Sequence, residues 1–483
     1  MSCSNRPLVR IDALSVHYPD RVRPALRGVT DEIDAGDAVV LTGPSGCGKS
    51  TLFRALTGFI PDTIDAQVAG EIRLDGLSVR EADPAAIATR VGLIQQDPDA
   101  QICTLNAWQE VAFGPENLCL PPAQVRARVE WALSVVGISH LANRKTTTLS
   151  GGEKQRLAIA SILAMEPEII LLDEPTANLD PEGAKAVFDL LKVLRGREGK
   201  TLVVAEHRLE PLLPLEPRLV VLDEGRIVTR RTTREREDLV ELGLRAYWEL
   251  HREPVVLRCE GGLELKDVAF GYGETPIFDH LSLCVEPGSI LGVIGPNGGG
   301  KTTLLRLIAG LDRPWNGDVV HPPGTTIGFV FQHPHQQIFE RTVRGEFAIE
   351  GVHDEEDLLQ GLTETRLTGL ADVPPHTLSL GEQRRLTVAT ALARTPNLVL
   401  LDEPFIGQDR HNAAWVIARI LTARARGAIT VLVSHDIPLT TALCDRLLYL
   451  GEEAIEGSVP SVLERLAALG KDAYLPGYWG GDR

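Results

Sequence analysis

The sequence contains no apolar run long enough to cross a membrane. A transmembrane helix needs roughly 20 consecutive apolar residues, and no run in this chain approaches that length. The opening residues, MSCSNRPLVR, also lack the pattern of a signal peptide. If the protein works at a membrane, we expect another chain to supply the span.

The chain also has fewer basic than acidic residues. The chain has 49 Lys and Arg residues against 66 Asp and Glu residues, which gives a formal net charge of −17. Broad binding to nucleic acid requires a basic face, so we expect no nucleic-acid partner. Sites for small phosphate compounds are local and remain compatible with this charge.

Cysteines are few and scattered. The chain has 7 of them, with no CxxC pair and no Cys/His spacing typical of a metal site. We therefore expect a reduced, cytosolic chain without disulfides. The composition, 43% hydrophobic and 24% charged, is that of a globular protein, and 483 residues exceed a single ordinary core.

What the sequence does contain is a phosphate-loop pattern, twice. Residues 37–42 (DAVVLT) predict a buried parallel strand, and GPSGCGKST at 43–51 leads into a helical run. Residues 289–294 (SILGVI) and GPNGGGKTT at 295–303 repeat the arrangement. Such loops surround phosphates with backbone N–H groups, a Lys charge and a hydroxyl for Mg²⁺. The predicted phosphate-binding residues are Gly43, Ser45, Gly46, Gly48, Lys49, Ser50 and Thr51, then Gly295, Asn297, Gly298, Gly300, Lys301, Thr302 and Thr303.

A second repeated pattern combines a helix start with small residues. It reads LSGGEKQR at 149–156 and LSLGEQRR at 378–385, here called the signatures. A Ser that caps a helix, followed by Gly, leaves backbone N–H groups open to an anion. Leu380 replaces the first Gly of the pair, and its side chain would crowd a phosphate there. The predicted anion-binding residues are Ser150, Gly151, Gly152, Ser379 and Gly381.

Downstream of each signature, an apolar strand ends in two acids. The segments are EIILLDE at 168–174 and NLVLLDE at 397–403. Ligands of open parallel sheets bind beyond the carboxyl ends of the strands. We therefore expect the aspartates to organise a Mg²⁺ ion and the glutamates to polarise an attacking water. These residues are Asp173, Asp402, Glu174 and Glu403.

The following strand ends in a histidine in each half, His207 after LVVAE and His435 after TVLVS. One strand-end histidine is usually structural, but two at matching positions favour a γ-phosphate sensor or transition-state clamp. The halves keep nearly one register from the signature onward, which indicates a duplicated domain. We predict a first domain at 1–230, a linker with a short amphipathic helix at 231–260, a second domain at 261–460 and a C-terminal tail at 461–483.

Together these elements resemble ABC-type ATPases over nearly the whole chain, twice. The resemblance implies an α/β fold of two tandem P-loop NTPase (RecA-like) domains. Each would carry a small antiparallel β portion and a helical subdomain. It further implies hydrolysis of ATP with Mg²⁺, and fused halves that replace an ATPase dimer and sandwich two ATP molecules head to tail.

The resemblance also assigns individual residues. Tyr18 and Tyr272 would stack on adenine, and Asp180 and Asp409 occupy the position called the D-loop. Two glutamines match the Gln loop, which couples the metal site to a transmembrane partner. The metal-binding residues implied are Ser50, Gln96, Asp173, Thr302, Gln332 and Asp402.

Three segments are similar to one group, the energy-coupling factor importers. They are QQDPDAQI at 95–102, EVAFGPENL at 110–118 and FQHPHQQIF at 331–339, although Gln95 stands where Phe is usual. This similarity implies a transmembrane T component, a substrate-binding membrane subunit, and import of a vitamin or transition-metal ion. The chain would then lie peripherally on the cytoplasmic face of the cell membrane.

Three alternatives stay open. One is a tandem ATPase of another ABC transporter class, and another is a non-catalytic ATP-gated scaffold. The third is a soluble ABC ATPase acting on ribosomes, against which the acidic balance and the short linker count. In the head-to-tail arrangement LSGGEKQR would serve the ATP held by Lys301, so we predict unequal sites, with that one faster. The transported substrate is not encoded in any residue of this chain.

Overall fold

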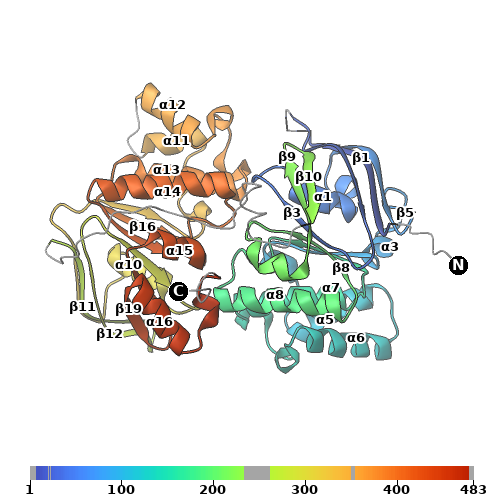
Figure 1. Ribbon diagram of the computed structural model, residues 1–483, viewed down its shortest axis with the longest axis horizontal. Helices are drawn as coiled ribbons and strands as arrows, with labels where there is room; N and C mark the ends of the chain where they lie inside the picture. The colour runs from blue at the N-terminus through green and yellow to red at the C-terminus, as the bar shows by residue number, and fades with distance from the viewer. Residues whose placement is uncertain (1–6, 20, 22, 233–260, 350–353, 478–483) are drawn as a thin grey trace. The chain divides into compact units, whose positions relative to one another are not determined.

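The computed structural model describes residues 7–19, 21, 23–232, 261–349 and 354–477, which form two compact units. The first contains the residues up to 232 except 180–182, and the second contains residues 261–477 together with Asp180–Glu182 (Figure 1). Each unit is described by itself. The short amphipathic helix predicted in the linker, at residues 237–248, lies outside the described residues, and the boundaries at 230, 260 and 460 stay predictions. No helix in the described ranges has the length and apolar character to span a membrane.

The core of the first unit is a mainly parallel sheet in the order β10-β9-β3-β8-β7-β6, in which only the β9–β10 pair is antiparallel. Strands β3 and β8 are buried along their whole length, as their unbroken apolar sequences predict. The strands are β3 Ala38–Thr42, β6 Val91–Ile94, β7 Ile169–Asp173, β8 Thr201–Ala205, β9 Arg218–Asp223 and β10 Arg226–Thr232.

A separate antiparallel sheet, in the order β2-β1-β4-β5, belongs to the same unit. It confirms the expected small antiparallel portion. Its strands alternate buried and exposed residues, as a sheet with one solvated face does. They are β1 Val9–His17, β2 Leu26–Ile33, β4 Gln67–Leu74 and β5 Leu77–Ser78.

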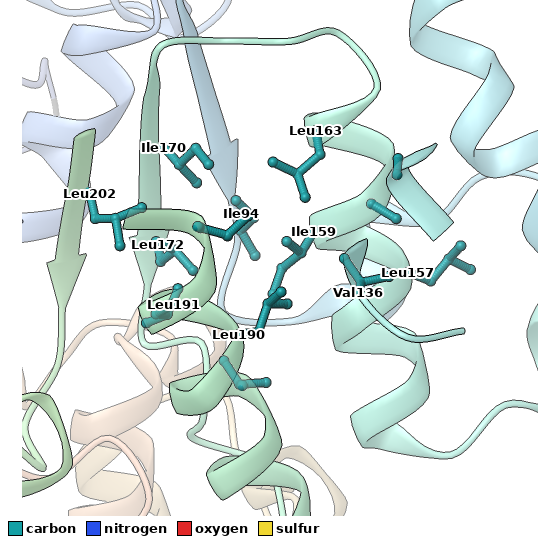
Figure 2. Packing of buried hydrophobic residues seen from close by; sticks show 14 of the residues in the cluster. Ile94, Val136, Leu157, Ile159, Leu163, Ile170, Leu172, Leu190, Leu191 and Leu202 are labelled. Atoms are coloured by element: carbon teal, nitrogen blue, oxygen red, sulfur yellow. The ribbon is translucent and has the colours of Figure 1, made fainter. Parts of the chain in front are cut away.

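Helices cover both faces of the core sheet. Alternate strand residues point to opposite sides, and because these residues are apolar on both sides, both faces must be buried. Val40 and Leu172 face a cluster with α5, α6, α7 and α8, part of which Figure 2 shows around Ile159 and Leu191. Val39 faces the other cluster, with α1 and the antiparallel sheet. The helices are α1 Lys49–Leu56, α2 Phe59–Asp62, α3 Pro84–Ala88, α4 Pro98–Gln101, α5 Ala107–Asn117, α6 Pro122–Val135, α7 Gly151–Leu163 and α8 Pro181–Gly196, with the 3-10 turns η1 Ser139–Leu141, η2 Thr146–Thr148 and η3 Glu210–Leu215.

The second unit repeats this plan. Its core sheet runs in the order β15-β16-β17-β13-β18-β19 and its antiparallel sheet in the order β12-β11-β14. Ile290 and Leu401 face one apolar cluster, whereas Leu291 and Leu400 face the other. The strands are β11 Leu263–Tyr272, β12 Thr275–Val285, β13 Ile290–Ile294, β14 Asn316–Val320, β15 Ile327–Val330, β16 Leu398–Asp402, β17 Ile429–Val433, β18 Arg446–Leu450 and β19 Ala454–Ser458.

The last described helix packs into the core of the second unit. Leu463 and Leu466 are buried, and the Tyr474 ring meets the Tyr449 ring edge-on at 5.1 Å between centroids. This part of the predicted tail therefore contributes to the core. The helices are α10 Lys301–Ile308, α11 Val343–Ile349, α12 Glu355–Glu364, α13 Leu380–Ala393, α14 Arg410–Ala425, α15 Ile437–Leu443 and α16 Val459–Ala468, with the 3-10 turns η4 Pro334–Gln336, η5 Thr368–Leu370, η6 Pro375–Thr377 and η7 Asp472–Tyr474.

One expectation about the cysteines is wrong. Cys284, on β12, is disulfide-bonded, although no disulfide was expected. Scattered spacing shows only that no local pair exists, and folding can bring distant cysteines together. Cys47, Cys103, Cys119 and Cys444 are not disulfide-bonded.

Candidate functional site

Each phosphate loop connects a central strand to the helix that follows it. Gly43, directly after β3, has φ +142°, and a Cβ there would lie 1.9 Å from the Leu222 carbonyl oxygen. Gly295, directly after β13, has φ +149°, and its Cβ would lie 2.1 Å from the Leu450 carbonyl oxygen. Only glycine fits these positions. The loops therefore follow the sheet closely and begin at its carboxyl edge, where the sequence predicted them.

A buried lysine folds over each loop. Lys49 Nζ donates to the Gly43 carbonyl at 3.0 Å, and Lys301 Nζ donates to the Gly295 and Pro296 carbonyls at 2.9 and 2.8 Å. Burial lowers the pKa of Lys301, and the carboxylate of Glu403 opposes that effect. Each ammonium group thus lies against the loop that would hold the phosphates.

In each unit a hydroxyl group in the first turn of the helix after the phosphate loop, α1 or α10, lies close to a strand-end carboxylate. Thr302 Oγ1 donates to Asp402 Oδ2 at 2.7 Å, and Ser50 hydrogen-bonds the Asp173 side chain. Burial raises the pKa of both aspartates, and the hydroxyl partners counteract this rise. Hydroxyl and carboxylate oxygens are the hard ligands that Mg²⁺ prefers. Both pairs therefore fit a magnesium ion bound together with a phosphate compound.

The first unit surrounds Glu174 with two side chains named from the sequence. Gln96 Nε2 donates to Glu174 Oε2 at 3.0 Å, and His207 Nε2 lies 3.2 Å from Oε1. Burial raises the pKa of Glu174, but the charge and hydrogen bond of His207, together with the charges of Lys49 and Arg208, outweigh burial, so the pKa is lowered overall. Glu174 also has φ +46°, an uncommon backbone conformation for a side-chain-bearing residue. The glutamate is held, ionised, at the end of β7.

The second unit arranges Glu403 differently. The His435 backbone N–H donates to Glu403 Oε2 at 3.2 Å, and His435 Nε2 lies 3.4 Å from Oε1 and 3.1 Å from Asn297 Oδ1. Burial, with the adjacent Asp402 carboxylate, raises the pKa of Glu403 to about 8. Within the described residues, Gln332 makes no hydrogen bond to Glu403, unlike Gln96 at Glu174. The two units thus share their residues but not all of their contacts.

Both signatures begin a helix with a capping box. Ser150 Oγ accepts from the Glu153 N–H at 3.4 Å, and Glu153 Oε2 accepts from the Ser150 N–H at 2.7 Å. Ser379 and Glu382 repeat this box on α13. The Ser-x-x-Glu spacing could have predicted it. Leu380 occupies the first helical position with 40% of its surface exposed.

Comparison with known proteins agrees with this geometry. The family model described as ABC transporter matches residues 26–177 and 278–406. The chain is also 34% identical over 517 aligned residues to the "Putative HMP/thiamine import ATP-binding protein YkoD" of Bacillus subtilis (strain 168), with 97% of this chain and 94% of that protein covered. The chain belongs to the ABC transporter family of ATP-binding proteins. It is an ATP-hydrolysing enzyme with two ABC domains in tandem.

A solved structure shows the same fold. A structure described as a model of ribosome-bound archaeal Pelota and ABCE1 matches with a TM-score of 0.70 and 22% identity, and covers 94% of this chain and 80% of that chain. The structure of cbiO1 from Clostridium perfringens, part of the ABC transporter complex cbiONQ, matches with a TM-score of 0.44 and 32% identity, and covers 49% of this chain and 92% of that chain. The first likeness shows the fold alone.

The two tyrosines assigned to adenine differ in setting. Tyr18 packs against the core of the first unit, and its hydroxyl lies 3.2 Å from Thr51 Oγ1. Tyr272 is exposed, donates to Asp312 Oδ2 at 3.4 Å and meets Phe270 edge-on. An exposed ring can stack on a base more readily than a half-buried one. The adenine role of both tyrosines stays a prediction.

Sequence reasoning missed a polar cluster beside His207. Glu206 is buried and accepts from Thr176 Oγ1 at 3.2 Å, and Arg208 donates to the Thr176 carbonyl at 2.7 Å. Burial raises the pKa of Glu206, although Arg208 opposes this. An acid and an arginine on either side of the strand-end histidine were the available signal. The cluster fastens the turn after Glu174 to the turn after β8.

Proposed function

We propose that this ABC ATPase is the energy-converting subunit of an importer of the energy-coupling factor type. It would drive uptake of a vitamin or transition-metal ion through a separate T component and a substrate-binding membrane subunit. The observation that carries the proposal is the match along almost the whole chain to a relative named for import. The Gln-loop segments at 95–102 and 331–339 support the same group.

Chemically, each half holds a full set of groups for ATP hydrolysis. We propose that the loop lysines bind the terminal phosphates, the strand-end glutamates accept a proton from the attacking water, and the histidines orient the γ-phosphate. Magnesium bound with ATP would neutralise phosphate charge, held by Ser50, Gln96 and Asp173 in one half and by Thr302, Gln332 and Asp402 in the other. Filled positions in both halves argue against a non-catalytic scaffold. The proposed catalytic residues are Glu174, His207, Glu403 and His435.

Beside the first Gln loop, a rigid loop presents an apolar side chain to solvent. Leu105 lies between α4 and α5 with 80% of its surface exposed. The buried carboxylate of Glu110 accepts from the N–H groups of Cys103 and Thr104 at 3.1 and 2.9 Å, which fixes the loop. Phe113, on the same helix as Glu110, is exposed as well. A fixed loop with exposed apolar groups is suited to a protein partner.

The second unit builds the corresponding loop in the same way. Glu346, buried on α11, accepts from the Phe339 N–H at 2.6 Å and from the Glu340 N–H. Phe339 itself is 75% exposed. The same support therefore recurs in both halves while the apolar side chains stay free. We propose that both loops receive the transmembrane T component, which would place the chain on the cytoplasmic face of the membrane.

A direct test is affinity purification of the tagged chain from detergent-solubilised membranes, with identification of what copurifies. We expect a multispan membrane protein and a smaller membrane subunit, and ATPase stimulation when these are reconstituted with the chain in liposomes. Copurifying ribosomes without a membrane partner would overturn the importer proposal and favour the ribosomal alternative. A membrane partner that exports its substrate would point to another transporter class.

A further inference from the structure

A buried arginine lies behind the second candidate site. Arg384, in the second signature, is only 2% exposed. Its Nη1 donates to the Phe331 carbonyl at 2.8 Å and reaches the Asp402 carbonyl at 3.5 Å, and its Nη2 donates to the Gln332 carbonyl. One guanidinium therefore joins three segments: helix α13, the Gln loop and the end of β16.

The described residues of the first unit make no such connection. Gln155 holds the equivalent place in LSGGEKQR and is 1% exposed, but its Nε2 has no hydrogen-bond partner among the described residues. There α7 is joined to the segment after Gln96 by a different contact, the ion pair of Lys154 Nζ with Asp99 Oδ1 at 2.6 Å. The Asp99 side chain is largely exposed, so water and salt weaken that pair. The two units thus fasten the signature helix to the Gln loop by unrelated means.

A buried guanidinium is costly unless its charge and its N–H groups are satisfied. Asp402 and Glu403 supply opposite charge to Arg384, and carbonyl oxygens accept from both terminal nitrogens, whereas its Nε has no hydrogen-bond partner among the described residues. Burial lowers the pKa of Arg384 to about 10, so the group keeps its charge at neutral pH. Hydrogen bonds from a charged donor are shorter and stronger than those between neutral groups. The arrangement is therefore a strong local clamp.

We propose that Arg384 is a positioning residue of the second ATP site: it clamps the Gln loop and the end of β16 to the signature helix. Gln332 and Glu403 are held by this clamp, one through its own carbonyl and the other through the carbonyl of the preceding residue. The clamp itself follows from contacts in one unit. Its effect on hydrolysis rests on the proposed roles of Gln332 and Glu403, and the two parts are tested separately.

The clamp is tested by hydrogen exchange in the full-length protein. Arg384→Gln should speed amide exchange across residues 331–337 by about tenfold or more, because loss of one charged hydrogen bond favours local opening to that degree. Arg384→Lys keeps the charge but not the forked geometry, and should show an intermediate increase. The matched control is Gln155→Ala, which leaves exchange at 95–101 unchanged. Wild-type exchange at 331–337 in Arg384→Gln, or in Arg384→Lys where the former does not fold, would refute the clamp.

Its catalytic effect is tested in a Glu174→Gln background. Adding Glu403→Gln first shows whether Glu403 carries the remaining ATPase rate; if it does not, the assignment of Glu403 has failed, not the clamp. Where it does, adding Arg384→Gln should lower kcat about tenfold or more with KM for ATP within about threefold, because Arg384 does not touch the phosphate loop. Arg384→Lys should restore part of kcat. Unchanged kcat together with faster exchange would overturn the positioning role.

Discussion

Leu105 offers the sharpest test of the proposed docking loops. Leu105 is 80% exposed, while its backbone carbonyl accepts from the Thr146 N–H at 3.1 Å. Leu105→Asp therefore changes the surface without removing a core contact or the Glu110 support. We expect the isolated chain to fold and to hydrolyse ATP within about twofold of wild type.

The expected loss in partner binding follows from the exposed area. Burying a leucine side chain contributes about 1.5–3 kcal/mol, which corresponds to about a 10- to 150-fold change in dissociation constant. Because most of the Leu105 surface is free, nearly all of this contribution is available to a partner. An aspartate there adds the cost of removing a charge from water, so the loss should reach or exceed this range.

The assay is titration of the reconstituted membrane partner with labelled wild-type and variant chains. Val228→Asp is the matched control, because Val228 on β10 is also an exposed aliphatic residue, at 58%, but lies away from both Gln loops in sequence. We expect Val228→Asp to bind as wild type does. Equal affinity of the Leu105→Asp chain, or an equal loss in both variants, would refute the assignment of this loop.

Three further predictions concern the sites themselves. Glu174→Gln and Glu403→Gln together should cut phosphate release about 100-fold or more while fluorescent ATP still binds; wild-type turnover would exclude both as bases, and a larger single loss for Glu403→Gln would support unequal sites. Leu380→Gly should raise the ATPase rate by relieving crowding at the second signature, and a slower enzyme would contradict that reasoning. Burial raises the pKa of Glu206 in the folded protein above its value in the unfolded chain. As pH rises above the usual pKa of Glu, the unfolded chain loses this proton first, and the folded state becomes less stable relative to it. Urea titrations should therefore show Glu206→Gln equal to wild type near pH 4 and more stable at pH 8, by about 1.4 kcal/mol per unit of raised pKa; lower stability at pH 8 would be the opposite sign.

The parts of the site that sequence predicted well are those determined by neighbours along the chain. A strand, a tight glycine turn and a helix must follow one another, so Lys49 and Lys301 could be placed without a structure. The same holds for Glu174 and Glu403, which end apolar strands. Parallel pairing then brings these strand ends to one edge of each sheet, which is a general property of such sheets.

The contacts missed from sequence join residues far apart in the chain. Arg384 reads as one more polar residue on a signature helix, and only the fold shows that its charge is buried against the Phe331 carbonyl. Glu110 likewise reads as a surface acid of α5, although it is buried as the acceptor for two loop N–H groups. Polar residues that satisfy distant backbone groups leave no periodic pattern. They are the part of a site that pattern reasoning cannot reach.

The two halves differ in these long-range polar contacts. In the first half Thr176, Glu206 and Arg208 bind one another beside Glu174. At the first two of these positions the second half has Phe405 and Ser434, and Phe405 packs into the apolar core instead. A polar cluster beside Glu174 has been exchanged for apolar packing, just as the partly exposed ion pair of Lys154 with Asp99 has been exchanged for the buried guanidinium of Arg384. Each half therefore keeps the same candidate site residues but holds them through different contacts. Disrupting one fastening should then slow one site and leave the fold of the other half intact.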